Sequence, residues 1–197
     1  MRRLHVKPLA VDRQIAGAIA QHTTPRLEQA SRVLTWVADE HVVYLLSAAL
    51  WLISQRNGRG SRAQANHILA CAVAANVLPH LLKSVISQER PDRCMVHGRR
   101  RGIPRSGRAL DAFPSGHAMH IGALASAAGW IYPEWRRLVW MVGGLLATTR
   151  VVLLAHWASD VAVGLGVGIL TEHLLRLVPG VQSSPVTISA ARSTHSE

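Results

Sequence analysis

Apolar residues along this chain gather in long blocks that are separated by short polar or basic connections. They do not alternate one by one with polar residues, which is the pattern of a strand with one face in water. Such blocks predict packed helices, and the connections contain the glycines and prolines that often end helices. Only the last block approaches the length of about 20 apolar residues that a helix needs to span a bilayer. The blocks cover residues 33–53, 63–82, 118–131, 138–154 and 157–178.

Polar residues are scattered within the blocks, so two arrangements fit the pattern. The helices form either the core of a soluble protein or a membrane bundle whose polar residues face its interior. The membrane arrangement is favoured, because five apolar blocks in 197 residues leave little polar surface to cover them. The predicted fold is therefore all-α, an integral-membrane bundle of about five to six helices. Small residues in the last two blocks would allow close packing of membrane helices; they are Gly143, Gly144, Gly164, Gly166 and Gly168.

The region before the first block predicts two further helical features. Apolar positions between residues 8 and 21 recur at near-helical spacing, which indicates a short amphipathic helix on a surface. Thr24 can cap a second helix that has Pro25 at its first position and leads into the first block. The predicted division is an interfacial region (1–32), one membrane-embedded domain (33–178) and a disordered, Ser- and Thr-rich tail (179–197).

The chain carries a net charge of +11, and 20 of its 22 basic residues are arginines. A basic excess can indicate nucleic-acid binding, but one phenylalanine and two tyrosines leave little for base stacking, so nucleic acid is not expected as a partner. The arginines lie between the apolar blocks, which favours anionic lipid headgroups or a phosphate substrate. Many of them can also simply hold helix ends at the membrane interface. The two cysteines, Cys71 and Cys94, have no spacing typical of a disulfide framework or a zinc site.

Three polar motifs flank the connections between blocks. If successive helices alternate in direction, all three motifs come to the same face of the membrane. Taken singly, each has an ordinary structural explanation as a helix boundary, a flanking charge or a local hydrogen bond, but together they predict a site. The first motif is Lys83 with Arg90-Pro91, the second is Ser115-Gly116-His117, and the third is Arg150 with His156 and Asp160.

The motifs contain the groups that phosphoryl transfer requires. Lys83, Arg90 and Arg150 can neutralise the charge on phosphate oxygens, and the two arginines offer forked hydrogen bonds. Ser115 and the Gly116 N–H add donors at the start of a helix, where the helix dipole favours an anion.

Two histidines and one carboxylate supply the reactive chemistry. His156 and Asp160 are four residues apart, which on a helix places them on one face. The carboxylate can then hold one ring nitrogen and leave the other free to attack. His117 is the candidate general acid for the leaving oxygen.

In order and spacing the three motifs resemble the signatures of the type 2 phosphatidic acid phosphatase superfamily. The matching segments are Lys83-x6-Arg90-Pro91, Pro114-Ser115-Gly116-His117 and Thr149-Arg150-x5-His156-x3-Asp160, with Thr149 where serine is usual. The resemblance implies that His156 is the nucleophile that forms a phosphohistidine, that Asp160 orients it and that His117 is the acid. It also implies no metal, no cofactor and phosphate binding by Lys83, Arg90, Ser115, Gly116 and Arg150.

The predicted protein is a multi-pass enzyme of the bacterial inner membrane that removes phosphate from a lipid. Its candidate substrates are phosphatidic acid, phosphatidylglycerol phosphate and polyprenyl phosphates or diphosphates. A vanadate-dependent haloperoxidase on the same fold and a non-catalytic lipid-phosphate-binding membrane protein are the alternatives. The sequence leaves open the substrate lipid, the oligomeric state and the role of the Arg-rich loop 93–108. It also leaves the orientation open, since the arginine distribution favours a cytoplasmic site and the resemblance to bacterial lipid-carrier phosphatases an outward one.

Overall fold

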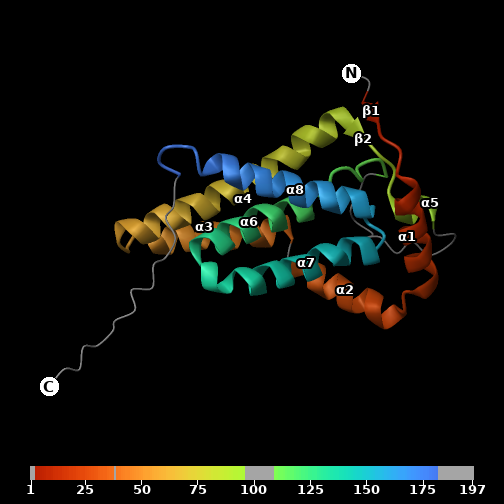
Figure 1. Cartoon of the computed structure of the whole chain (residues 1–197), viewed down its shortest axis with the longest axis horizontal. Coiled ribbons are helices and arrows are strands. Elements are labelled where there is room, and N and C mark those ends of the chain that lie inside the picture. The colour runs from red at the N-terminus through yellow and green to blue at the C-terminus, as the bar shows by residue number, and fades with distance from the viewer. Residues whose placement is uncertain (1–2, 38, 96–108, 182–197) are drawn as a thin grey trace.

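The computed structural model describes residues 3–37, 39–95 and 109–181, and Figure 1 shows long helices that run along one axis. One helix, α6, lies at the centre and packs against α4, α7 and α8, while α3 packs on α4 and α2 on α7. This architecture confirms the all-α prediction. The helices of the bundle are α2 (Pro25–Val37), α3 (Glu40–Ser54), α4 (Arg59–Val85), α6 (Gly116–Ile131), α7 (Arg136–Val152) and α8 (Ala158–Leu175).

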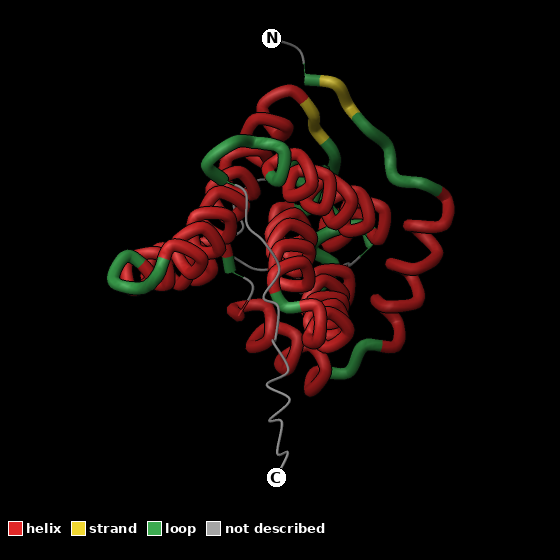
Figure 2. The backbone as a smooth tube through the Cα atoms, turned by 60° about the vertical axis from the view of Figure 1, so that its left-hand side comes forward, coloured by secondary structure: helices red, strands yellow, loops and turns green. Residues whose placement is uncertain are grey.

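Shorter elements gather at one end of the bundle, where α4 and α7 end and α6 and α8 begin (Figure 1). The two-residue strands β1 and β2 pair there in parallel. Figure 2 shows the chain passing from β1 into α1, which lies along the edge of the bundle. A helix was predicted here, and its place at the membrane surface stays a prediction. These elements are β1 (Leu4–His5), α1 (Ala10–His22), β2 (Ile86–Ser87) and α5 (Pro91–Cys94), and a 3-10 helix (Pro133–Trp135) joins α6 to α7 at the other end.

Local capping sets where the first bundle helices begin. The backbone N–H of Leu27 donates to Thr24 Oγ1 at 3.3 Å, and Pro25 is the first residue of α2, as predicted. The block expected over 33–53 is divided into two helices, because Asp39 caps α3 by accepting the N–H of His41 at 3.0 Å. Asp39, a polar residue inside the predicted apolar block, thus caps the start of a helix.

Three helical stretches in the described part of the chain are long and apolar enough to cross a membrane. They are Pro25–Ser54, Arg59–Val85 and Ala158–Leu175. The prediction that only the last block reaches spanning length was wrong, because polar residues inside α4 find partners on other helices and do not end it. Asn66 Oδ1 accepts the indole N–H of Trp51 on α3 at 2.7 Å.

A buried polar network joins α4, α6 and α8 near the C-terminal end of α8. The Glu172 carboxylate accepts hydrogen bonds from His67 Nε2 at 2.9 Å and from Ser126 Oγ at 2.7 Å. Arg176 pairs with the same carboxylate, and its guanidinium lies 4.3 Å from the ring centroid of Trp130. The buried charge of Glu172 is therefore matched, as a low-dielectric interior requires.

Candidate active site

The three motifs meet at the end of the bundle where α4 and α7 end and α6 and α8 begin (Figure 1). The turn between α7 and α8 is tight, because the N–H groups of Ala155 and His156 both donate to the carbonyl of Arg150, at 3.1 and 3.2 Å. Within it, Leu154 is buried and has a φ of 52°, in the left-handed region that a branched side chain rarely adopts. Such strained backbone persists where the surroundings hold it in place, commonly at functional sites.

The imidazole of His156 is buried and held in one orientation. Its Nδ1 lies 2.6 Å from the carbonyl oxygen of Ala112. A carbonyl can only accept, so the ring carries its proton on Nδ1 and keeps the lone pair on Nε2. The geometry therefore leaves the lone pair of Nε2 outside this hydrogen bond.

Asp160 does not hold the imidazole in the way the sequence predicted. Its Oδ2 is 3.9 Å from His156 Nδ1, an ion-pair distance but not a hydrogen bond. The reason is that α8 begins at Ala158, so His156 lies before the helix and not one turn from Asp160 on the same face. Asp160 Oδ2 instead accepts the backbone N–H of Trp157 at 2.9 Å, which caps the start of α8.

Arg90 joins the two backbone segments that position His156. Its guanidinium is buried and donates to the carbonyl of Ala155 at 3.3 Å and to that of Asp111 at 3.5 Å. Ala155 directly precedes the histidine, and Asp111 directly precedes the residue whose carbonyl holds the ring. Arg90 of the first motif thus links the backbone just before the second motif to the backbone within the third.

The second motif forms the N-terminus of the central helix. Ser115 is buried and caps α6, with its Oγ 3.4 Å from the N–H of Ala118, and its own N–H donates to the carbonyl of Asp160 at 3.2 Å. Gly116 begins the helix, and a Cβ added to it would lie 3.6 Å from the ring of Pro79 on α4. His117 follows in the first turn and is partly exposed. This helix start carries the donors and the positive dipole end that favour an anion.

Cationic side chains from three segments act on the two histidines. The charges of Lys83, Arg90 and Arg150 each interact with both His117 and His156. Burial, followed by these three charges, holds the pKa of His156 well below its usual 6.5, although the hydrogen bond to the Ala112 carbonyl opposes the shift. His156 is therefore neutral at neutral pH and able to act as a nucleophile.

Several groups that shape the site had no signal in the sequence motifs. The Ala112 carbonyl is one, and Thr35 is another, since its hydroxyl oxygen accepts a hydrogen bond from the Arg150 guanidinium at 3.0 Å across from α2. Most of the Arg-rich loop 93–108 and of the tail 179–197 lies outside the described residues. Within the described ranges, no group of three or more His, Cys, Asp or Glu residues is placed to hold a metal ion.

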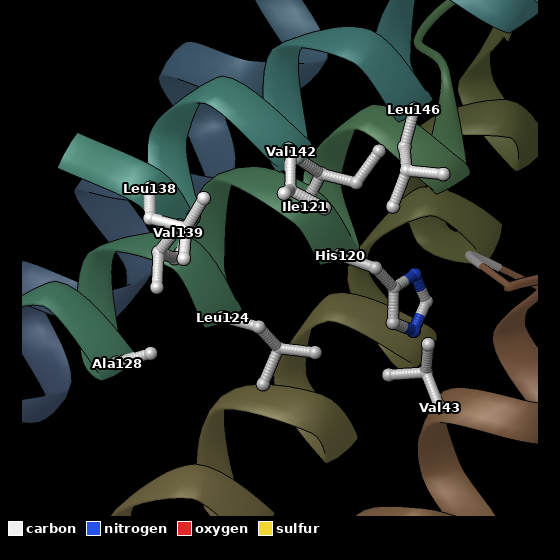
Figure 3. Close-up of a pocket in the computed structure, with 11 residues that line it drawn as sticks. Val43, His120, Ile121, Leu124, Ala128, Leu138, Val139, Val142 and Leu146 are labelled. Carbon is white, nitrogen blue, oxygen red and sulfur yellow. The ribbon is translucent and has the colours of Figure 1, made fainter. Parts of the chain in front are cut away.

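An apolar groove of about 420 Å³ lies beside the second motif, between α3, α6 and α7 (Figure 3). His120, one turn beyond His117 on α6, points into the groove at one end. Its Nδ1 lies 3.0 Å from the carbonyl oxygen of Gly116, so this end of the groove adjoins the start of α6. The other lining residues are Val43, Ile121, Leu124, Ala125, Ala128, Leu138, Val139, Val142, Gly143 and Leu146.

Comparison of the sequence with known families finds a match to the model described as the PAP2 superfamily over residues 64–182. Two curated relatives, from Rhizobium etli and Rhizobium johnstonii, are both described as lipid A 1-phosphatase. The first is 35% identical over 103 residues, which are 52% of this chain and 44% of the relative. The second is 35% identical over 113 residues, which are 57% and 46% respectively. The matches thus span less than half the length of either relative.

Two solved structures share the fold. The crystal structure of Aquifex aeolicus LpxE has a TM-score of 0.69 and 17% identity, and the likeness covers 87% of this chain and 98% of that one. The crystal structure of the first transmembrane PAP2 type phosphatidylglycerolphosphate phosphatase, from Bacillus subtilis, has a TM-score of 0.62 and 20% identity. The likeness covers 84% of this chain and 82% of that one. Together with the three helical stretches of the described chain that are long and apolar enough to cross a membrane, this fold is that of a multi-pass membrane protein.

Proposed function

The chain belongs to the PAP2 superfamily, and we propose that it is a membrane lipid phosphatase that acts through a phosphohistidine on His156. The observation that carries the proposal is the fixed orientation of the His156 ring. The Nδ1–H of His156 donates a hydrogen bond to the Ala112 carbonyl at 2.6 Å, so the lone pair of Nε2 is available for attack. Three cationic side chains act on the same position, where the phosphate would be bound.

The proposed reaction has two steps. In the first, Nε2 of His156 attacks phosphorus, and the N–P bond forms as the bond to the lipid oxygen breaks. Burial and the nearby cationic side chains hold the pKa of His117 well below its usual 6.5, so His117 takes up its proton when the anionic phosphate offsets those charges, and it gives this proton to the leaving oxygen. In the second, water attacks the phosphorus, the N–P bond breaks, and His117 takes a proton from the water. Both histidines are restored and inorganic phosphate is released.

The remaining residues stabilise charge in this scheme. Lys83, Arg90 and Arg150 neutralise the phosphate oxygens, whose charge is spread in the transition state. Ser115 and Gly116 place the N-terminus of α6 beside the same oxygens. Asp160 Oδ2 is 3.9 Å from Nδ1, which is within ion-pair distance of the imidazole that becomes positively charged once Nε2 is phosphorylated.

The position of the site supports a lipid as the substrate. The apolar groove between α3, α6 and α7 begins at His120, so a hydrocarbon chain can lie in it while the phosphate reaches the helix start (Figure 3). Its volume of about 420 Å³ falls within the usual range for ligand pockets. The two Rhizobium relatives make lipid A 1-phosphate the first substrate to test.

A panel of lipid phosphates in detergent tests the proposal. Phosphate release would be measured from lipid A 1-phosphate, phosphatidic acid, phosphatidylglycerol phosphate and undecaprenyl diphosphate, with p-nitrophenyl phosphate as a control without a tail. We expect at least one lipid to be hydrolysed with a much higher kcat/KM than the control. Tight binding of these lipids without any phosphate release would instead indicate a non-catalytic binding protein, and halide oxidation dependent on added vanadate would indicate a haloperoxidase.

The pH profile provides a second prediction. Because burial and the nearby cationic charges lower the pKa of His156, the acidic limb of kcat/KM is expected to lie below the ordinary histidine pKa of 6.5. Replacing Lys83 with glutamine removes a positive charge that disfavours protonation, so it should raise the pKa of His156 and move this limb to higher pH. Both enzymes would be assayed on the same lipid, which makes the ionisation of the substrate common to the two profiles. A limb that moves to lower pH in K83Q would contradict the assigned role of the charge.

Metal chelation provides a third prediction. Three cationic side chains can neutralise the phosphate in this site, so a divalent metal is not needed for that task. We expect millimolar EDTA to change the rate of phosphate release by less than about twofold, whereas orthovanadate should inhibit competitively as a phosphate analogue. Loss of activity in EDTA that returns on addition of a divalent metal would refute metal-independent catalysis.

A further inference from the structure

The N-terminal segment 3–22 lies outside the residues matched by the family model, yet it contacts the segments that carry all three motifs. The N–H of Val6 donates to the carbonyl of Ser87 at 2.9 Å, just before Arg90 in the first motif. Arg3 pairs with Asp111 at 3.4 Å, beside the residue whose carbonyl holds His156. These contacts fasten the segment to the site end of the bundle (Figure 2).

Helix α1 also packs directly on the backbone segments around His156. Ala16 is buried in a cluster with Ala112, Leu154 and Trp157. Ala112 supplies the carbonyl that orients the imidazole, and the other two residues lie within two positions of His156. One face of α1 therefore forms part of the support beneath the nucleophile.

Asp12 makes the polar contact between α1 and the third motif. Its side chain is 1% exposed, although the segment around it is otherwise basic. Asp12 Oδ1 accepts the N–H of Ser159 at 2.9 Å, and Oδ2 accepts the Ser159 hydroxyl at 2.6 Å. Oδ2 also accepts the N–H of Leu9 at 3.0 Å, at the start of its own helix.

This geometry makes one carboxylate the cap of two helices. The first N–H groups of a helix have no partner within the helix, and a negative charge there also interacts favourably with the helix dipole. Asp12 satisfies one such N–H on α1 and one on α8. On α8 the N–H belongs to Ser159, which lies between His156 and Asp160 in the sequence and directly precedes the latter.

We propose that Asp12 is a positioning residue for the reaction: it fixes the start of α8, and with it the turn that sets His156 and Asp160 against the phosphate. It acts through Ser159 and does not touch the substrate. The inference rests on the proposed function, because its kinetic consequence is a loss in the phosphatase reaction. Its structural consequence, a looser turn over residues 153–160, can be measured without any turnover.

Kinetics of matched aspartate variants form the first test. Asp12→Ala is expected to lower kcat for the lipid phosphate by about 10- to 100-fold, since small displacements of a catalytic group have costs of this size. KM should change by less than about threefold, because the cationic residues that bind phosphate are untouched. Asp39→Ala is the control: Asp39 caps α3 through the His41 N–H and, within the described part of the chain, makes no hydrogen bond to the site residues, so the kcat of this variant should stay within about twofold of wild type.

The partner residue tests whether the effect travels through Ser159. Ser159→Ala removes the hydroxyl bond but keeps the backbone N–H, so a smaller loss of kcat is expected than for Asp12→Ala. The double variant should be no slower than Asp12→Ala alone, because the serine hydroxyl has lost its acceptor there. Asp12→Asn keeps the shape of the side chain and one acceptor oxygen, so its kcat should fall between those of wild type and Asp12→Ala. This variant also keeps the test informative if Asp12→Ala fails to fold.

Hydrogen exchange measured by mass spectrometry separates this inference from the proposed function. Peptides that cover residues 153–160 should take up deuterium faster in Asp12→Ala and Asp12→Asn, and at the wild-type rate in Asp39→Ala. If wild type hydrolyses no lipid phosphate, the proposed function fails, but the exchange result still decides whether Asp12 holds the turn. Unchanged exchange in this region, or a kcat loss that Asp39→Ala shows equally, would overturn the role of Asp12.

Discussion

Replacing His156 with alanine is expected to lower the rate of phosphate release by about 10⁴-fold or more, to the level of the detergent blank. In the proposed reaction this side chain supplies the nucleophilic Nε2, which the Ala112 carbonyl orients through the hydrogen bond from Nδ1. The loss should appear in kcat, because the variant keeps Lys83, Arg90 and Arg150, the proposed phosphate-binding residues. Binding of the lipid, measured separately, should therefore be largely retained.

Two other histidines provide controls for this variant. His80 and His173 are exposed, and the Nδ1 of each lies against a carbonyl of its own helix, at 2.7 and 2.8 Å. They therefore resemble His156, whose Nδ1 lies against the carbonyl of Ala112, but neither belongs to a motif. Their alanine variants should keep at least half of the wild-type rate. A phosphoenzyme that is stable in base and labile in acid should form in wild type and be absent in His156→Ala. Turnover in His156→Ala above about one tenth of the wild-type rate would remove the residue from the nucleophile role.

The helices and the motif side chains could be predicted because their signals lie in side-chain type and spacing. The apolar blocks indicated the bundle, and the motifs indicated which cations and histidines meet at one end. What the sequence could not indicate is the carbonyl of Ala112, since a backbone oxygen has no sequence signature. The hydrogen bond from Arg150 to Thr35 also had no sequence signature, because the threonine lies inside an apolar block.

One prediction about the site differed because of a helix boundary. Spacing of four residues places His156 and Asp160 on one face only if both lie in the same helix. The helix begins at Ala158, so the carboxylate caps it and the histidine turns toward Ala112. Helix starts are uncertain by one or two residues from sequence, and at this position that uncertainty decides which group orients the nucleophile.

The second large effect concerns the glycines that bring α6 and α8 together. A Cβ on Gly168 would lie 2.2 Å from the carbonyl oxygen of Met119, and a Cβ on Gly164 would lie 2.6 Å from that of Ser115. These are backbone atoms, which cannot move aside as a flexible side chain can. Gly122 repeats the arrangement from α6, where a Cβ would be 2.3 Å from the Leu165 carbonyl oxygen. The second and third motifs are therefore held at their present distance by the absence of side chains.

Gly168→Ala is accordingly expected to force α8 away from α6 and to cost several kcal/mol of stability, in the range of severe overpacking. Gly166→Ala is the matched control, two residues away in the same helix, where a Cβ meets nothing within 4 Å. There the added methyl group should be neutral or raise stability by up to about 1 kcal/mol, because alanine favours the helix. Thermal unfolding in detergent and the rate of phosphate release would be measured for both. A Gly168→Ala protein with wild-type melting and turnover would mean that the close approach of α6 and α8 does not set the site. A loss of stability and turnover in Gly168→Ala, with none in Gly166→Ala, would show that one missing methyl group keeps Ser115 beside Asp160.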